Sequence, residues 1–491
     1  MSKRKRPRKH TKSEAKDYTP LAGHQRKGSK LTPPLATIPK LKTMSWTNDR
    51  LPEMLWATLL VSSLPRERAL ATFRALASYI AEYENGEKPH DITHSGLART
   101  QPPILASMLA YLMASAPDIR GALRPLLLFE SLPARDHWAQ AISLEPAPDD
   151  WNALATAVSR TLFHQSQEAT DCRWLRLICL GAADKLALPT QEIANELNRY
   201  PSHGDMREVR PTIRSTEGAV ASMFELDPKW ASGFWAECLD KTPCVLLPAG
   251  TDQVAPQAGT TRQRVVEVYG LLAQHALDTT TTTAVDPAHD TSFGLALYSL
   301  ALLEQLLRIG VSNTVIARTG LRTLVEVYIT LAYLSWRSDP AAWSSFRVYG
   351  AGQAKLAYLK LDDVPLRANY VDVQTLKDLA NEDLWQEFLS IDLGHWQNAN
   401  LRQLSIDSGT KPIYDKYYPW ASAIAHGLWG PVRDVVFDTC GNPLHRLHRI
   451  PRPQPRSLPD LVPDACEVVD LTLDLLSKLF PTFSHGVSMV P

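Results

Sequence analysis

Three side chains that can donate or accept a proton lie at four-residue spacing in the segment YYPWASAIAHGLWG. They are Tyr418, Ser422 and His426, and their neighbours are mainly Ala, Trp and Leu. Residues four apart share one face of an α-helix, so the sequence predicts a polar stripe on an otherwise apolar helix. Imidazole titrates near neutral pH, which suits it to proton transfer in catalysis. The stripe can therefore be an acid–base site or, alternatively, a hydrogen-bonded network inside a helical core.

A second predicted helix carries charged residues in apolar surroundings. In ARTGLRTLVEVYITLAYL, Arg318, Arg322 and Glu326 follow one another at intervals of four residues. An unpaired buried charge is strongly destabilising, so Arg322 and Glu326 are expected to pair with each other. If this helix packs against the one that carries His426, the charged and polar groups share one pocket between helices. Such pockets are usual locations for sites in helical bundles.

If these residues form the site of a nuclease, the chemistry would be cleavage of RNA without a metal ion. His426 would take the proton from an RNA 2′-hydroxyl or give one to the leaving oxygen. Arg322 would stabilise the charge that develops on the phosphate. Ser422 and Tyr418 would orient the reacting group, and Glu326 would hold Arg322. The competing hypothesis is that all five residues form a satisfied polar network that locks the two helices together.

The segments RTLVEVYITLAYL and YPWASAIAHG together resemble a bacterial all-α domain family of unknown function. In that family, a helix with Arg-x3-Glu and a following aromatic residue is succeeded by Tyr-x3-Ser-x3-His-Gly, and the resemblance covers about residues 290–440. Its helical form, with Arg and His carried on helices, is similar to the HEPN superfamily of nucleotide-binding and RNase domains. HEPN nucleases carry Arg-x4–6-His near the start of one helix, and the helix here does not carry that motif.

No other motif predicts a cofactor or a metal centre. The segment LHRLHRI places His445 and His448 three residues apart, close to Cys440. A metal site would need a further ligand, so a basic patch is the preferred interpretation and no metal is predicted. The sequence has no Walker loop, GxGxxG or GxSxG motif, so no cofactor is expected. The six cysteines form no CxxC pair and fit a reducing cytosol without disulfides.

The first 42 residues are strongly basic, with about 13 Lys or Arg against about 2 Asp or Glu. Because the whole chain has 52 basic and 52 acidic residues, the remainder carries a matching negative excess. The arm has few large apolar residues and is predicted to be disordered. Its charge favours contact with nucleic acid, although a solvated tail without a partner is the alternative. The residues that would make this contact are Lys3, Arg4, Lys5, Arg6, Arg8 and Lys9.

The rest of the chain shows helical periodicity and no sustained β alternation, so the expected fold class is all-α. Two helical domains are predicted behind the disordered arm. The first covers residues 43–240, a linker rich in Pro, Gly and Thr covers 241–263, and a C-terminal helical bundle covers 264–491. One helix within the bundle is expected to run from Tyr414 to Phe437. No apolar run is long enough for a membrane span, and no secretory signal is visible.

These patterns favour a bacterial cytoplasmic protein whose HEPN-like helical domain binds or acts on RNA or a nucleotide, in phage defence or a stress response. Enzymatic activity stays open, and an enzyme of this kind would be a metal-independent RNase. The alternative is a non-catalytic helical interaction or scaffold protein whose basic tail touches nucleic acid. RNA or a nucleotide is the expected partner, no membrane partner is expected, and a homodimer is compatible with the sequence.

Overall fold

The chain folds as two compact units. The computed structural model describes residues 23–27, 30–33, 45–83, 88, 91–186, 190–200, 206–221, 226–246, 258–363, 370–382, 389–446, 448–481 and 483–488. Unit 1 comprises Met1–Leu247 together with Thr439–His448, and unit 2 comprises Pro248–Asp438 together with Arg449–Pro491. The chain therefore leaves unit 1, returns to it for a short segment, and then completes unit 2.

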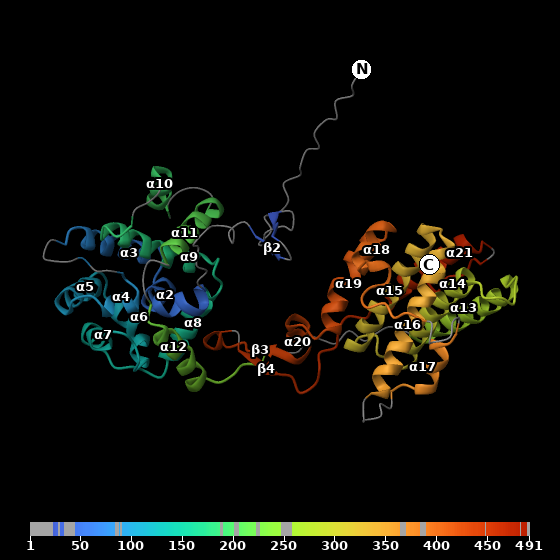
Figure 1. The fold of residues 1–491 in the computed structure, drawn as a ribbon. Helices are drawn as coiled ribbons and strands as arrows, with labels where there is room; N and C mark the ends of the chain where they lie inside the picture. The colour runs from blue at the N-terminus through green and yellow to red at the C-terminus, as the bar shows by residue number, and fades with distance from the viewer. Residues whose placement is uncertain are drawn as a thin grey trace, which may run out of the picture. The chain divides into compact units, whose positions relative to one another are not determined.

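Both units are built from helices (Figure 1), which confirms the predicted all-α fold class. The β-structure of the described residues is limited to two short sheets. In one, β1 (Gln25–Lys27) pairs antiparallel with β2 (Lys30–Thr32), and in the other, β3 (Phe437–Thr439) pairs with β4 (Arg449–Pro451). The β1–β2 hairpin lies within the basic arm and was not expected from the sequence. Among the described helices, none combines the length and the apolar character that a membrane crossing requires.

Unit 1 contains most of the shorter helices. Short π and 3-10 turns precede or interrupt them: η3 (Trp46–Arg50), η4 (Arg124–Leu128) and η6 (Pro443–His445). The α-helices are α1 (Leu51–Glu53), α2 (Leu55–Ser63), α3 (Arg66–Ala81), α4 (His94–Ala98), α5 (Pro102–Ala114), α6 (Ile119–Leu123), α7 (Arg135–Ile142), α8 (Asp150–Leu162), α9 (Gln167–Ala182), α10 (Gln191–Arg199), α11 (Met206–Ala221) and α12 (Pro228–Lys241).

Helix α2 lies at the centre of unit 1. Its residues 55–61 are all buried, so it is apolar around its whole circumference rather than on one stripe. Helices α3, α6, α8 and α9 pack around it. The largest side chains of this core are tryptophans with almost no exposed surface, and each anchors a different segment: Trp56, Trp138, Trp174 and Trp230.

The core of unit 1 also encloses an ion-pair network. The fully buried Arg176 of α9 donates from Nη2 to Asp91 at 2.6 Å and from Nη1 to Glu217 of α11 at 2.7 Å. Arg50 and Arg173 also lie within ion-pair distance of Glu217, at 3.2 and 3.7 Å. Buried charges persist in a protein core only when they are paired. This network therefore fixes α9 and α11 to Arg50 of η3 and to Asp91.

Unit 2 is a bundle of longer helices, and α15 is its central member. Figure 1 shows α15 beside α19, and α15 also packs on α14 and α21. The elements are α13 (Ala258–Thr279), α14 (Pro287–Arg308), α15 (Val315–Arg337), α16 (Pro340–Asp362), α17 (Val373–Ala380), η5 (Trp396–Asn398), α18 (Leu401–Asp407), α19 (Lys411–Ala425), α20 (Trp429–Val436) and α21 (Val462–Leu479). Tyr417 ties α19 to α21, because its hydroxyl donates to Asp464 at 2.8 Å.

The predicted helix from Tyr414 to Phe437 is two helices, α19 and α20, so that expectation was wrong. The break is at Gly427, whose φ of 59° lies in the left-handed region. The amide of Gly427 donates to the carbonyl of Ile424 at 3.0 Å, and the amide of Leu428 donates to that of Ala423 at 3.0 Å. This pair of bonds is a Schellman motif, in which glycine ends a helix because it adopts positive φ without strain.

Candidate functional site

Three of the five predicted catalytic residues meet where α15 packs on α19. The Nη2 atom of Arg322 lies 2.9 Å from Oε1 of Glu326 and donates to the Tyr418 hydroxyl at 3.1 Å. The Tyr418 hydroxyl donates in turn to Oε1 of Glu326, also at 3.1 Å. The Arg322 guanidinium lies 5.3 Å from the centre of the Tyr418 ring, within range of a cation–π interaction. The predicted pairing of Arg322 with Glu326 is therefore present, and Tyr418 closes a three-membered polar network.

Arg318, one turn before Arg322, donates hydrogen bonds to backbone carbonyl groups instead. It donates to the carbonyl oxygens of Ser312 at 2.8 Å and Thr314 at 3.2 Å, and it also contacts the carbonyl oxygen of Pro459. Burial lowers the pKa of its guanidinium from the usual value. The side chain therefore holds the segment before α15 and the segment before α21 in place.

Ser422 and His426 lie further along α19, away from this network. His426 is the C-cap residue of α19, and its side chain is exposed at the turn formed by Gly427. A helix rises about 1.5 Å per residue, so the backbone of His426 lies about 12 Å along the axis from that of Tyr418. Ser422 is half-buried between them. The structure thus brings three of the five residues together and leaves Ser422 and His426 further along α19.

The segment from residue 420 to 430, which we call the α19–α20 corner, exposes large apolar side chains around His426. Trp420 is 56% exposed, Leu428 is 55% exposed and Trp429 is 63% exposed. The ring of Trp420 lies so close to Gly430 that a Cβ atom there would be 3.3 Å from it. Tryptophan is enriched at interfaces, and large apolar side chains exposed close together are typical of a binding surface.

The predicted nucleic-acid contacts of the arm fall outside the part of the chain that the structure describes. These residues are Lys3, Arg4, Lys5, Arg6, Arg8 and Lys9. Their role in binding therefore stays a prediction from charge.

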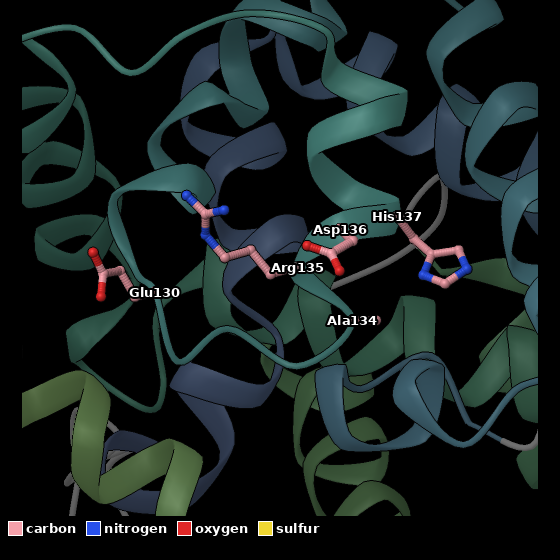
Figure 2. A pocket seen from close by; sticks show the side chains of 5 residues that line it. All are labelled: Glu130, Ala134, Arg135, Asp136 and His137. Atoms are coloured by element: carbon pink, nitrogen blue, oxygen red, sulfur yellow. The ribbon is translucent and has the colours of Figure 1, made fainter.

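A surface pocket of about 570 Å³ lies in unit 1, at the start of α7. Figure 2 shows its lining, in which the His137 ring points away from Arg135 and from Glu130. The Nη2 atom of Arg135 donates to the carbonyl of Leu127 at 3.4 Å, so this guanidinium supports the pocket wall. A catalytic site requires its polar groups to converge on one position, and the polar groups of this pocket do not.

A second cluster in unit 1 contains metal-ligand residue types. Cys244, Cys440, His445 and His448 each present a sulfur or ring nitrogen atom, and these four atoms lie within 4.8 Å of one another. The sequence had indicated three of the four as neighbours but gave no reason to add Cys244. Its place in the cluster depends on the return of residues 439–448 to unit 1.

Comparison with known proteins locates one family within the chain. Residues 303–442 match the model of a family described as a family of unknown function, DUF5677. The matched region contains both segments that carry the resemblance described above, and it leaves unit 1 almost entirely outside. Neither the curated proteins nor the solved structures contained a match to this chain.

Proposed function

We propose that unit 2 binds RNA or a nucleotide at the α19–α20 corner, and that His426 there serves as the acid–base group of a metal-independent RNase acting in the cytoplasm. The observation that carries the proposal is the exposure of His426 between two exposed tryptophans, Trp420 and Trp429. Single-stranded RNA is commonly held by stacking its bases on aromatic side chains. An exposed imidazole beside such a surface can reach a 2′-hydroxyl and exchange a proton with it.

In this proposal, His426 at the end of α19 and Arg322 of α15 contact different parts of the RNA. Arg322 contacts Tyr418, and the backbone of His426 lies about two helical turns along α19 from that of Tyr418, so we assign the two groups to neighbouring positions on the RNA rather than to one phosphate. In the proposed complex, His426 acts at the reacting ribose, and Arg322 contacts a neighbouring phosphate of the same strand. Glu326 and Tyr418 hold Arg322 in position, and Ser422 lies on α19 between Tyr418 and His426.

A HEPN-like relationship and a role in phage defence or a stress response complete this proposal. They rest on the resemblance of the α15 and α19 segments to helical domains that act on RNA. A homodimer is part of the same proposal, because the two-fold dimer is the commonest assembly among soluble oligomers.

The second candidate is a non-catalytic helical interaction protein. It is favoured by the network of Arg322, Glu326 and Tyr418, in which each group already has a partner on the neighbouring helix. On this hypothesis the exposed tryptophans contact another protein, and His426 has no chemical role.

The deciding experiment compares wild-type chain with His426→Ala on a labelled single-stranded RNA, with EDTA present and no added metal. General acid–base catalysis contributes about 10²–10⁴-fold, so cleavage should fall by about 100-fold or more. His395→Ala is the matched control, since His395 is another exposed histidine of unit 2. Thermal melts of all chains in the same buffer show whether folding has changed.

Binding is measured separately from cleavage, by anisotropy with Trp420→Ala, Trp429→Ala and the control Trp336→Ala, which removes an exposed tryptophan of α15. Loss of one stacked base weakens affinity by about 1–3 kcal/mol, and only the first two variants should show it. RNA binding without cleavage would refute the nuclease assignment alone. A wild-type chain that neither binds nor cleaves RNA, with a lower melting temperature for His426→Ala, would favour the interaction protein.

A further inference from the structure

We propose that Cys244, Cys440, His445 and His448 form a structural zinc site that clamps the returning segment of the chain into unit 1. The site is independent of the proposed RNA chemistry, because all four residues lie in unit 1. Two thiolates and two imidazoles are a ligand set that selects tetrahedral Zn²⁺.

Three of the six distances within the cluster match the edges of a metal tetrahedron, and all four atoms lie within 4.8 Å of one another. The Nδ1 atom of His445 lies 3.3 Å from Sγ of Cys440 and 3.5 Å from Sγ of Cys244. The Nδ1 atom of His448 lies 3.6 Å from Sγ of Cys244. With zinc–sulfur bonds of about 2.3 Å and zinc–nitrogen bonds of about 2.0–2.1 Å, ligand atoms on one ion lie about 3.3–3.8 Å apart. The three measured separations fall in this range.

The surroundings of His445 leave the correct nitrogen available for the metal. Its Nε2 atom lies 3.0 Å from the carbonyl oxygen of Thr242. A carbonyl only accepts, so Nε2 carries the proton and Nδ1 presents its lone pair to both sulfurs. One lone pair can take a hydrogen bond from only one thiol, but a cation would satisfy it together with both sulfurs. Ligand histidines usually donate their second ring N–H to a carbonyl in this way.

The backbone and a neighbouring amide hold the remaining parts of the site. The amide of Val245 donates to Sγ of Cys440 at 3.4 Å, a hydrogen bond that a sulfur atom bound to an ion could still accept. The Nδ2 atom of Asn442 donates to the carbonyl of Pro243 at 2.8 Å and to the Thr242 hydroxyl at 3.0 Å. The segment that carries Cys244 is therefore fixed to the loop that carries the other three ligands before any ion binds.

The position of the ligands in the chain indicates what the ion would do. Cys244 comes just before the chain leaves unit 1, and Cys440, His445 and His448 lie in the segment that returns to it. One ion would therefore join the two ends of a very long excursion, and the entropy removed by closing a loop grows with its length. Four protein ligands leave no open position, which is typical of structural rather than catalytic zinc. Binding releases the two thiol protons and leaves an uncharged site.

The first test measures metal in the full-length chain, purified under reducing conditions without chelator and analysed by elemental mass spectrometry. About one zinc ion per chain is expected. Cys244→Ser and His448→Gln remove the two ligands with exposed or half-buried side chains, so the fold of unit 1 should survive while the zinc content falls. Cys238→Ala and His395→Gln are the matched controls and should keep the ion, because neither residue belongs to the cluster.

The second test uses cobalt as a spectroscopic probe and hydrogen exchange as a structural one. Reduced wild-type chain loaded with Co²⁺ should show the absorption bands of tetrahedral cobalt bound to thiolate, and Cys244→Ser should not. Removal of zinc should make amide exchange within residues 440–448 about tenfold faster.

Two results would overturn the zinc site. The first is a folded, reduced wild-type chain that binds neither Zn²⁺ nor Co²⁺. The second is full zinc content in both Cys244→Ser and His448→Gln. Neither result bears on His426, so this proposal and the RNA proposal fail separately.

Discussion

The hydroxyl of Tyr418 accepts a hydrogen bond from Nη2 of Arg322 at 3.1 Å, and this contact joins α19 to α15. The same hydroxyl donates to Glu326 at 3.1 Å, so the Tyr418 oxygen is hydrogen-bonded to both members of the Arg322–Glu326 pair. Tyr414 stacks on the Tyr418 ring at a centroid distance of 4.9 Å, which fixes the ring independently of its hydroxyl. The contribution of the hydroxyl can therefore be separated from that of the ring.

We predict that Tyr418→Phe lowers the free energy of unfolding of unit 2 by about 1–2 kcal/mol, because two hydrogen bonds are lost while stacking and the Arg322–Glu326 pair remain. Urea denaturation followed by circular dichroism measures this change. Cleavage of RNA should fall modestly in comparison with His426→Ala, since Tyr418 only positions Arg322. An unchanged unfolding free energy would show that the network does not stabilise the packing of α15 on α19.

The basic arm predicts that the affinity of the chain for RNA depends measurably on salt concentration. Each phosphate neutralised on single-stranded RNA contributes about −0.7 to the slope of log K against log salt concentration. Six basic residues lie between Lys3 and Lys9, so deleting residues 1–10 should make the slope shallower by up to about 4. Anisotropy titrations at several salt concentrations give both slopes. Equal slopes for the full chain and the shortened one would mean that the arm is a solvated tail.

The buried ion-pair network predicts that the stability of unit 1 depends strongly on one carboxylate, that of Glu217. Burial would raise the pKa of Glu217, but the surrounding Arg50, Arg176 and Arg173 lower it below the usual value. Glu217→Gln leaves these arginines without their shared counter-charge, which should cost about 3–5 kcal/mol of unfolding free energy at pH 7. Because the folded pKa is depressed, the stabilisation is present above the unfolded pKa and is lost as pH falls through the folded one.

This prediction is checked by urea denaturation of both chains from pH 7 towards pH 3. The difference between them should shrink as the pH falls, because protonation then removes the same charge from the wild type. Glu237→Gln is a suitable control, since Glu237 pairs with Ser131 at the surface of unit 1. A constant difference across this range would contradict the proposed role of ionised Glu217.

What the sequence could predict depends on the range of the interactions involved. The pairing of Arg322 with Glu326 follows from helical periodicity, because both residues lie on one helix. The end of α19 was missed because a glycine is tolerated within a helical pattern, and only the positive φ of Gly427 shows that the helix stops there. Cys244 could not be joined to Cys440 from the sequence, since that contact depends on how the chain returns to unit 1. Local signals therefore gave the fold class and the polar pair, whereas the non-local fold decides the composition of the sites.

The imidazole of His94 predicts a second pH dependence of stability. It arises from a buried group that is neutral in the folded protein, whereas Glu217 is a buried group that is charged. Its ring is fully buried and packs edge-on against Trp138 and Trp230, with centroid distances of 5.6 and 5.7 Å. Within the described part of the chain, neither ring nitrogen has a hydrogen-bond partner. Burial alone lowers the pKa of His94 from 6.5 to about 3. The folded protein therefore holds a neutral imidazole over most of the acidic range.

Because the unfolded chain binds a proton at His94 below pH 6.5 and the folded chain does not, stability is complete above that pH and decreases as the pH falls towards 3. This one residue should account for about 2 kcal/mol of lost stability between pH 7 and pH 5. His94→Phe keeps an aromatic ring in the same space and removes the titrating group. The difference in unfolding free energy between variant and wild type should therefore shift by that amount in favour of the variant, as measured by urea denaturation at both pH values. A shift of the same size in His137→Phe, which changes a half-buried imidazole of unit 1, would assign the effect to general acid sensitivity rather than to the burial of His94.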